Sequence, residues 1–239
     1  MIEMAEETNS PAIELLDLYC KTMKENEEFI HRNADETYGE VIDLINDAID
    51  LIGFAVEREN SKEDYVKRSM IFFLYHILMP LSYAIYTDLL IGNLPACFME
   101  LRLMLELLVK CYCADLKYPE HTFFQEKLEL LENKLRKNSI STSKLMKDLG
   151  KRIGLKNDFV TLWGKLSEYW MHTKGIIDKI VSQIGEKSGA PSWALVIPIN
   201  YAEDDLDTIK ELGKRISQFR KLLKVTIENY KQQETSEGI

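Results

Sequence analysis

The stretch that decides the fold runs from Val66 to Asp115 and is VKRSMIFFLYHILMPLSYAIYTDLLIGNLPACFMELRLMLELLVKCYCAD. Its two halves are strongly apolar and are separated by Gly92-Asn93, a dipeptide typical of turns. Pro95 falls where the first turn of the second half would be, and a proline costs nothing there because the first N–H groups of a helix have no partner. The stretch therefore predicts two central helices, the first of them kinked or split at Pro80.

The rest of the 239-residue chain shows the same helical character. Only 11 glycines and 6 prolines are present, which favours long helices over many short strands. On the second predicted helix, Ile42, Ile45, Ile49, Ile52 and Val56 follow helical spacing and predict its buried face. We expect an all-α fold, a single domain of seven to nine helices built around the central pair. Its segments are acidic N-terminal helices (1–60), a central bundle (61–184), an irregular loop (185–202) and a C-terminal amphipathic helix (203–233).

Residues 69–87 contain no Asp, Glu, Lys or Arg, which meets the length rule for a membrane-spanning helix. A helix that is apolar on all sides is also what the centre of a large bundle requires. His76 and Pro80 within the segment favour the bundle core. We therefore expect no membrane contact and a cytoplasmic protein, and the acidic first residues, MIEMAEETNS, do not resemble a secretory signal.

The net charge is −9, which argues against a dedicated DNA-binding protein. The charge is nevertheless uneven, because residues 1–60 carry a net −12 and residues 134–156 a net +7. A charged stretch of this kind is commonly a solvated helix face. The alternative is that the basic stretch binds an anion or RNA, with Lys147, Lys151 and Arg152 as the candidate ligand-binding residues.

Familiar catalytic and metal-binding patterns are missing from the sequence. The cysteines Cys20, Cys97, Cys111 and Cys113 form no C-x-x-C and have no histidine at zinc-ligand spacing, so we expect reduced, buried thiols. The sequence also lacks a Gly-rich phosphate loop, H-E-x-x-H, G-x-S-x-G and an EF-hand loop. We therefore predict no metal and no cofactor.

Charged residues interrupt the second central helix. Arg102, Glu106 and Lys110 are four residues apart and share one face of an otherwise apolar helix. A charge in such surroundings must be paired or must reach water through a cavity. The pair Arg102–Glu106 is therefore either structural, with Lys110 reaching outward, or lines a polar pocket in which Arg102 would hold a phosphate or carboxylate.

The helix Leu101–Tyr112, followed by Leu166-Ser-Glu-Tyr-Trp-Met-His172, resembles a group of prokaryotic helical proteins that are similar in outline to the HEPN superfamily. Many HEPN proteins are dimeric RNases or nucleotide-binding partners in toxin–antitoxin and defence systems. The resemblance covers roughly residues 66–184 and would make Arg102, Glu106 and His172 the catalytic candidates. The hallmark HEPN motif, R-x(4–6)-H, is absent, because no arginine lies four to six residues before His172.

These observations predict a non-enzymatic binding module that acts as a homo-oligomer (a dimer), with a nucleotide, RNA or a protein as its partner. The alternative is an HEPN-like nuclease or nucleotide-processing enzyme. A dimer seam is one explanation for the apolar stripe Ile209, Leu212, Ile216, Phe219, Leu223 and Tyr230, whose steps of three and four residues fit helix pairing. Packing inside one chain explains the same stripe, and we prefer it.

Overall fold

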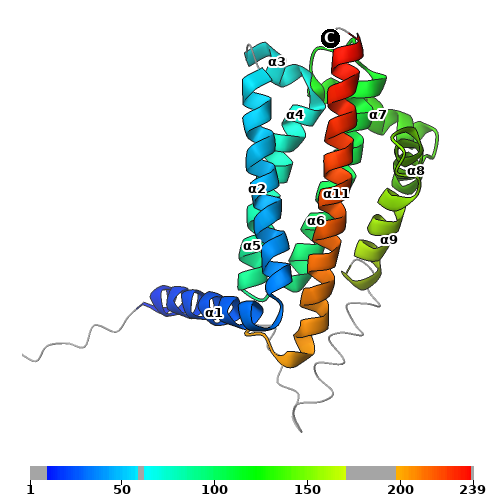
Figure 1. Ribbon diagram of the computed structural model, residues 1–239. Helices are drawn as coiled ribbons and strands as arrows, with labels where there is room; N and C mark the ends of the chain where they lie inside the picture. Colours follow the sequence, from blue (N-terminus) through cyan, green and yellow to red (C-terminus); the bar gives the residue numbers. More distant parts are fainter. Residues whose placement is uncertain (1–9, 59–61, 171–197, 238–239) are drawn as a thin grey trace, which may run out of the picture.

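The computed structural model describes residues 10–58, 62–170 and 198–237, and every regular element in them is helical. This confirms the prediction of an all-α multi-helix bundle. The helices, shown in Figure 1, are α1 (Pro11–Asn33), α2 (Asp35–Arg58), α3 (Lys62–Lys67), α4 (Ser69–Phe73), α5 (Met79–Leu90), α6 (Leu94–Lys117), α7 (Phe124–Lys137), α8 (Thr142–Arg152), α9 (Asp158–Trp170) and α11 (Leu206–Glu237), with a π-helical turn at Leu74–Leu78 and a 3₁₀ turn at Glu203–Asp205.

Helix α6 lies at the centre of the bundle, as the sequence predicted. It packs against α4, α5, α7, α8, α9 and α11, so most of its circumference is covered. Leu101, Met104, Leu105 and Leu108 are completely buried along it, and Tyr112 is among the largest fully buried side chains. The apolar sequence of this helix is thus explained by packing on nearly all sides.

The first half of the deciding stretch forms α3, α4 and α5 in succession, with two irregularities between them. Arg68 has an extended backbone conformation and separates α3 from α4. Five residues, Leu74–Leu78, then form a π-helical turn directly before Met79-Pro80. Because Pro80 has no N–H to donate, a locally widened turn accommodates it without a complete break in the helix. The predicted irregularity at Pro80 therefore takes the form of a π turn.

The combined segment Ser69–Leu90 is long and apolar enough to cross a membrane, by length and composition alone. Core helices of soluble proteins meet the same test. In the bundle, Phe73, Leu78 and Ile85 of this segment are completely buried against the neighbouring helices.

Helix α2 packs more extensively on α11 than on any other element. Its buried face consists of Val41, Leu44, Ile45, Ala48 and Ala55, whereas Ile49 and Val56 are about half exposed. The predicted stripe was therefore wrong in its orientation by roughly one residue. The physical reason is that the buried face includes the small Ala48 and Ala55, which carry less hydrophobic weight in a sequence pattern than the half-exposed Ile49 and Val56.

Close approach of α2 and α11 is centred on Gly213. A methyl group added at Gly213 would lie 2.5 Å from Thr37 Oγ1 and 2.9 Å from its Cα. Thr37 Oγ1 also donates a hydrogen bond to the Ile209 carbonyl at 3.1 Å. Only glycine permits this separation of the two helices.

The apolar stripe of α11 is buried within its own chain. Ile209, Leu212, Ile216 and Phe219 have no exposed surface, and Leu223 is 1% exposed. The stripe therefore packs in the core of the bundle, which is the explanation preferred from the sequence, and it is not available as a dimer seam.

Candidate functional site

The Arg102–Glu106 pair lies at the contact between α6 and α9. Arg102 Nε donates to Glu106 Oε1 at 3.0 Å, and Trp163 Nε1 of α9 donates to the same oxygen at 2.7 Å. The Arg102 guanidinium lies over the Trp163 ring, 4.8 Å from its centroid. Both charged side chains are only about one-fifth exposed. Each charge is thus matched inside the protein, which fits the structural interpretation of the pair.

The predictions for Lys110 and His172 have different outcomes. Lys110 does not simply reach into solvent, because its Nζ pairs with Glu132 Oε1 of α7 at 2.6 Å. His172 lies outside the described residues, so the predicted grouping of Arg102, Glu106 and His172 stays a prediction. Sequence reasoning did not anticipate Trp163, although a buried indole N–H usually finds a hydrogen-bond acceptor such as Glu106.

Three of the four cysteines match the prediction of buried thiols. Cys97, Cys111 and Cys113 are buried, and burial raises the pKa of the Cys113 thiol to about 11. Such thiols remain protonated and unreactive near neutral pH. Cys20 is exposed, so the prediction was wrong for it. In the described residues, no group of three or more His, Cys, Asp or Glu side chains is arranged to hold a metal ion.

The predicted ligand-binding residues lie on α8, on the outer side of the bundle between α7 and α9 (Figure 1). Ser141 caps this helix by accepting a hydrogen bond from the Lys144 backbone N–H at 3.3 Å. Leu145, Met146 and Leu149 bury one face of the helix. Lys147 and Lys151 lie on the opposite face, Arg152 ends the helix, and all three are exposed.

The turn after α8 is tightly closed, which holds the next lysine in place. The backbone N–H groups of Leu155 and Lys156 both donate to the Gly150 carbonyl, at 2.7 and 2.9 Å. A methyl group at Gly150 would lie 2.4 Å from the Lys156 carbonyl oxygen, so the turn requires glycine there. Gly154 and Lys156 both have positive φ, which reverses the chain into α9.

The last turn of α7, helix α8 and the turn into α9 carry eight exposed cations, and we name these cations together the basic surface. All its cations are exposed, and none forms an ion pair with another residue in the described ranges. Asp148 is the only acidic residue between positions 134 and 156. The basic surface consists of Lys134, Arg136, Lys137, Lys144, Lys147, Lys151, Arg152 and Lys156.

Other cations of the bundle, unlike those of the basic surface, form ion pairs with acidic side chains. Arg220 of α11 pairs with three carboxylates of α2, from Glu40 (2.7 Å), Asp43 (2.9 Å) and Asp47 (2.6 Å). These contacts raise the pKa of Arg220 and fasten α11 to α2. The acids of α2 thus compensate the charge of Arg220 within the bundle.

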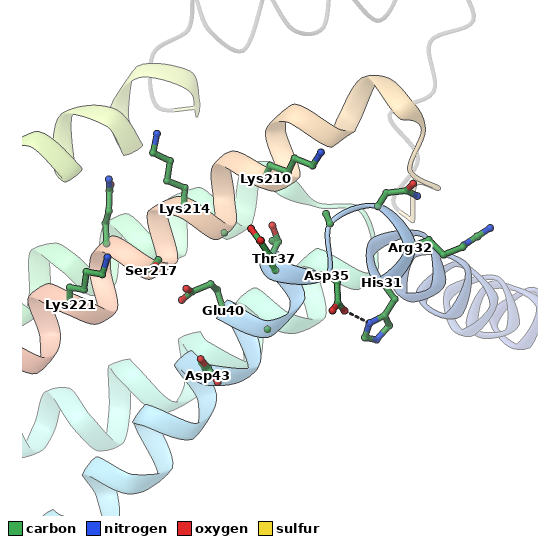
Figure 2. A pocket seen from close by; sticks show the side chains of 16 residues that line it. His31, Arg32, Asp35, Thr37, Glu40, Asp43, Lys210, Lys214, Ser217 and Lys221 are labelled. Atoms are coloured by element: carbon green, nitrogen blue, oxygen red, sulfur yellow. Dashed lines mark hydrogen bonds and ion pairs between the residues drawn. The ribbon is translucent and has the colours of Figure 1, made fainter.

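A groove of about 1100 Å³ runs between α2 and α11. Lys210, Lys214 and Lys221 of α11 form one wall, while Glu40 and Asp43 of α2 form the other (Figure 2). Acidic and basic walls face one another here, so the field inside the groove is largely cancelled. In the described residues no carboxylate pairs with a cation of the basic surface, which makes this surface the stronger candidate for binding an anion.

Comparison of the chain with models of protein families, with curated proteins and with solved structures found no match. The description of the protein therefore rests on the fold and the site: a helical bundle in which eight exposed cations occupy the end of α7, helix α8 and the turn that leads into α9.

Proposed function

We propose that this protein is a helical binding module, self-associating and without catalytic activity, that uses the basic surface to hold a single-stranded RNA through its phosphates. The observation that carries the proposal is that eight exposed cations fall within 23 consecutive positions (134–156) and that none has an ion-pairing carboxylate in the described residues. Because these cations form no ion pair within the protein, no such pair has to be broken when they bind a phosphate. The Coulombic attraction between cation and phosphate therefore contributes fully to binding.

A polymer fits this surface better than a mononucleotide. The eight cations are spread over the last turn of α7, the length of α8 and the turn into α9, so one phosphate group could meet only a few of them. A flexible single strand can follow such a short basic strip. The rest of the chain carries a net −16 (−9 for the whole chain minus +7 for residues 134–156), which disfavours a long rigid duplex. Phosphate contacts carry little sequence information, so we expect sequence-independent binding.

The HEPN-like enzyme remains an alternative prediction. It requires a free anion-binding group in α6, and the contacts of Arg102 with Glu106 and Trp163 do not favour that requirement. The resemblance itself supports only the expectation that RNA is the class of ligand.

Fluorescence anisotropy with a labelled RNA of roughly 20 nucleotides at low salt tests the proposal. We expect the triple variant Lys147→Glu, Lys151→Glu, Arg152→Glu to bind at least about 10-fold more weakly. The matched control reverses Lys21, Lys24 and Lys210 to Glu, three exposed cations away from the basic surface, with the same change in net charge. Equal losses in both variants, or no binding by the native chain, would overturn the proposal.

A further inference from the structure

Helix α1 begins with ten residues that its own bundle does not cover. Residues 11–20, which we name the α1 arm, are all exposed except Tyr19, which is half-buried. Ile13, Leu15, Leu16 and Leu18 are between 43% and 64% exposed. Figure 1 shows the arm projecting sideways from one end of the bundle. Leu15 and Leu16 lie on neighbouring positions of one side of this segment, with Ile13 and Leu18 on its two flanks, and such exposed apolar residues are of the kind that marks an interaction surface.

The base of the arm is firmly anchored. Asn26 is buried and its Nδ2 donates to the carbonyls of Leu90 and Ile199, both at 2.8 Å, while its Oδ1 accepts from the Tyr201 backbone N–H at 2.8 Å. One side chain therefore joins α1 to the end of α5 and to the chain leading into α11.

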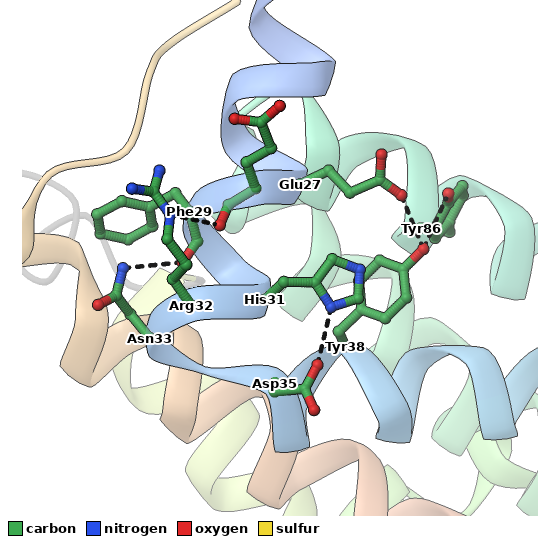
Figure 3. A network of polar contacts seen from close by, with 9 residues as sticks. Glu27, Phe29, His31, Arg32, Asn33, Asp35, Tyr38 and Tyr86 are labelled. Atoms are coloured by element: carbon green, nitrogen blue, oxygen red, sulfur yellow. Dashed lines mark hydrogen bonds and ion pairs between the residues drawn. The ribbon is translucent and has the colours of Figure 1, made fainter.

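A second set of contacts fixes the turn from α1 into α2 (Figure 3). Tyr38 of α2 donates to Glu27 Oε1 of α1 at 2.9 Å and contacts the Tyr86 hydroxyl at 3.5 Å. The contact with Tyr86, then burial and the bond to Glu27, raise the pKa of the Tyr38 hydroxyl, so it stays a donor. His31 Nδ1 pairs with Asp35 Oδ1 at 2.8 Å across the same turn. The arm thus leaves the bundle in a fixed direction.

The apolar side of the arm continues the face that α1 packs on its own bundle. Thr22, Asn26 and Ile30 are the buried residues of α1. Steps of three and four residues back from Thr22 lead to Tyr19, then to Leu15 and Leu16, and then to Ala12. Glu14 and Asp17 fall on the opposite side of the helix. The packing face therefore extends beyond the edge of the bundle, with its charged side in water.

We propose that the arm pairs antiparallel with the arm of a second copy of this chain, face to face, around a two-fold axis between Leu15 and Leu16. The length of the uncovered segment argues for this occupant. An antiparallel arm of the second copy would cover residues 12–19 and would end where the bundle of the first copy begins to cover α1. Each arm thus covers the segment of α1 that the other chain leaves exposed. The pairing opposes Leu15 to the partner's Leu16 and Ala12 to the partner's Tyr19, and aligns the two helix dipoles antiparallel.

The proposal rests on the self-association included in the proposed function, and it is independent of RNA binding. The contact involves only about ten residues from each copy, which is at the low end of specific interface sizes. We therefore expect a dimer that dissociates in the micromolar range.

Sedimentation equilibrium of the full chain, from about 1 to 200 µM, tests the pairing. We expect the native chain to dimerise and the variant Leu15→Glu, Leu16→Glu to dissociate at least about 10-fold more readily. The control Ile49→Glu places the same charge on an apolar residue of α2 that is 46% exposed, and it should dimerise normally. A native chain that is monomeric throughout, whether or not it captures another helical protein, would overturn the proposal, as would an unaffected double variant.

Cys20 reports the orientation of the two arms, because it is exposed while the other three cysteines are buried. Antiparallel pairing about the Leu15–Leu16 axis places the two Cys20 Cα atoms about 17 Å apart, from nine helical rises and one interhelical spacing. Parallel pairing would place them at about 8–10 Å. A nitroxide on Cys20 should give one short distance by pulsed electron paramagnetic resonance, lost in Leu15→Glu, Leu16→Glu. A distance typical of parallel pairing, or none, would contradict the proposal, and RNA binding can be measured separately on the same samples.

Discussion

The Asp115 carboxylate and the Lys127 ammonium form an ion pair at 3.2 Å in which the side chains are only 7% and 6% exposed. Asp115 also accepts the Ser69 and Met70 backbone N–H groups, at 2.9 and 3.0 Å, and the Tyr230 hydroxyl at 3.0 Å. One side chain at the end of α6 thus caps α4 and contacts α7 and α11. Because the Asp115 carboxylate is paired and hydrogen-bonded on all these sides, it holds four helices in register.

Removing this carboxylate should be strongly destabilising. Asp115→Asn leaves the Lys127 charge buried without a counter-charge, and we expect the free energy of unfolding in urea to fall by about 3–5 kcal/mol. The double variant Asp115→Asn, Lys127→Met should recover a large part of that loss, because it removes both charges. An Asp115→Asn protein as stable as the native chain would contradict the assigned role.

The indole of Trp163 should stabilise the Arg102–Glu106 pair by a smaller amount. Trp163→Phe retains a ring but removes the hydrogen bond to Glu106 and weakens the stacking of Arg102, so we expect a loss of about 1–2 kcal/mol. Urea unfolding followed by circular dichroism is the suitable measurement, since the substitution removes one of the three tryptophans. An unchanged midpoint would show that the pair does not depend on α9.

Gly213 should be intolerant of any side chain. Gly213→Ala forces α11 away from Thr37 and should cost about 1–3 kcal/mol. Gly39→Ala on α2 is the matched control, because a methyl group there has nothing within 4 Å. That control should be neutral or stabilising by up to about 1 kcal/mol, as expected for glycine replaced by alanine inside a helix. Equal effects of the two substitutions would contradict the close approach of α2 and α11.

Glu100 should make stability depend on pH. Burial, then the nearby carboxylate of Asp88, raises the pKa of the Glu100 carboxyl to about 8, well above its value in the unfolded chain. The folded protein therefore holds this proton more tightly, so its contribution to stability is complete below about pH 4.5 and is lost as the pH rises through about 8. We expect Glu100→Gln to flatten the fall in the urea midpoint between pH 5 and pH 9. The same fall in both proteins would refute this assignment.

Local sequence patterns predicted what depends on local physics. The apolar content of Leu94–Asp115 was enough to identify α6 as the central helix, and the spacing of Arg102 and Glu106 was enough to pair them. The exposure of Lys147, Lys151 and Arg152 likewise follows from the amphipathic pattern of α8.

Contacts between distant segments were not predictable in this way. Asp115 caps a helix that begins 46 residues earlier, and Arg220 meets acids more than 170 residues away. Neither partner has a local signal, because each is chosen by how the helices pack. The orientation of the α2 stripe was wrong by roughly one residue because the buried Ala48 and Ala55 carry less hydrophobic weight than the exposed Ile49 and Val56.

The salt dependence of RNA binding tests the central claim most directly. The logarithm of the association constant should fall linearly with the logarithm of salt concentration, by about 0.7 for each phosphate contact with a single strand. The variant Lys147→Glu, Lys151→Glu, Arg152→Glu should therefore show a slope that is shallower by about 2. A native slope near zero, or an equal slope in native chain and variant, would contradict the claim that the basic surface binds the phosphates of RNA.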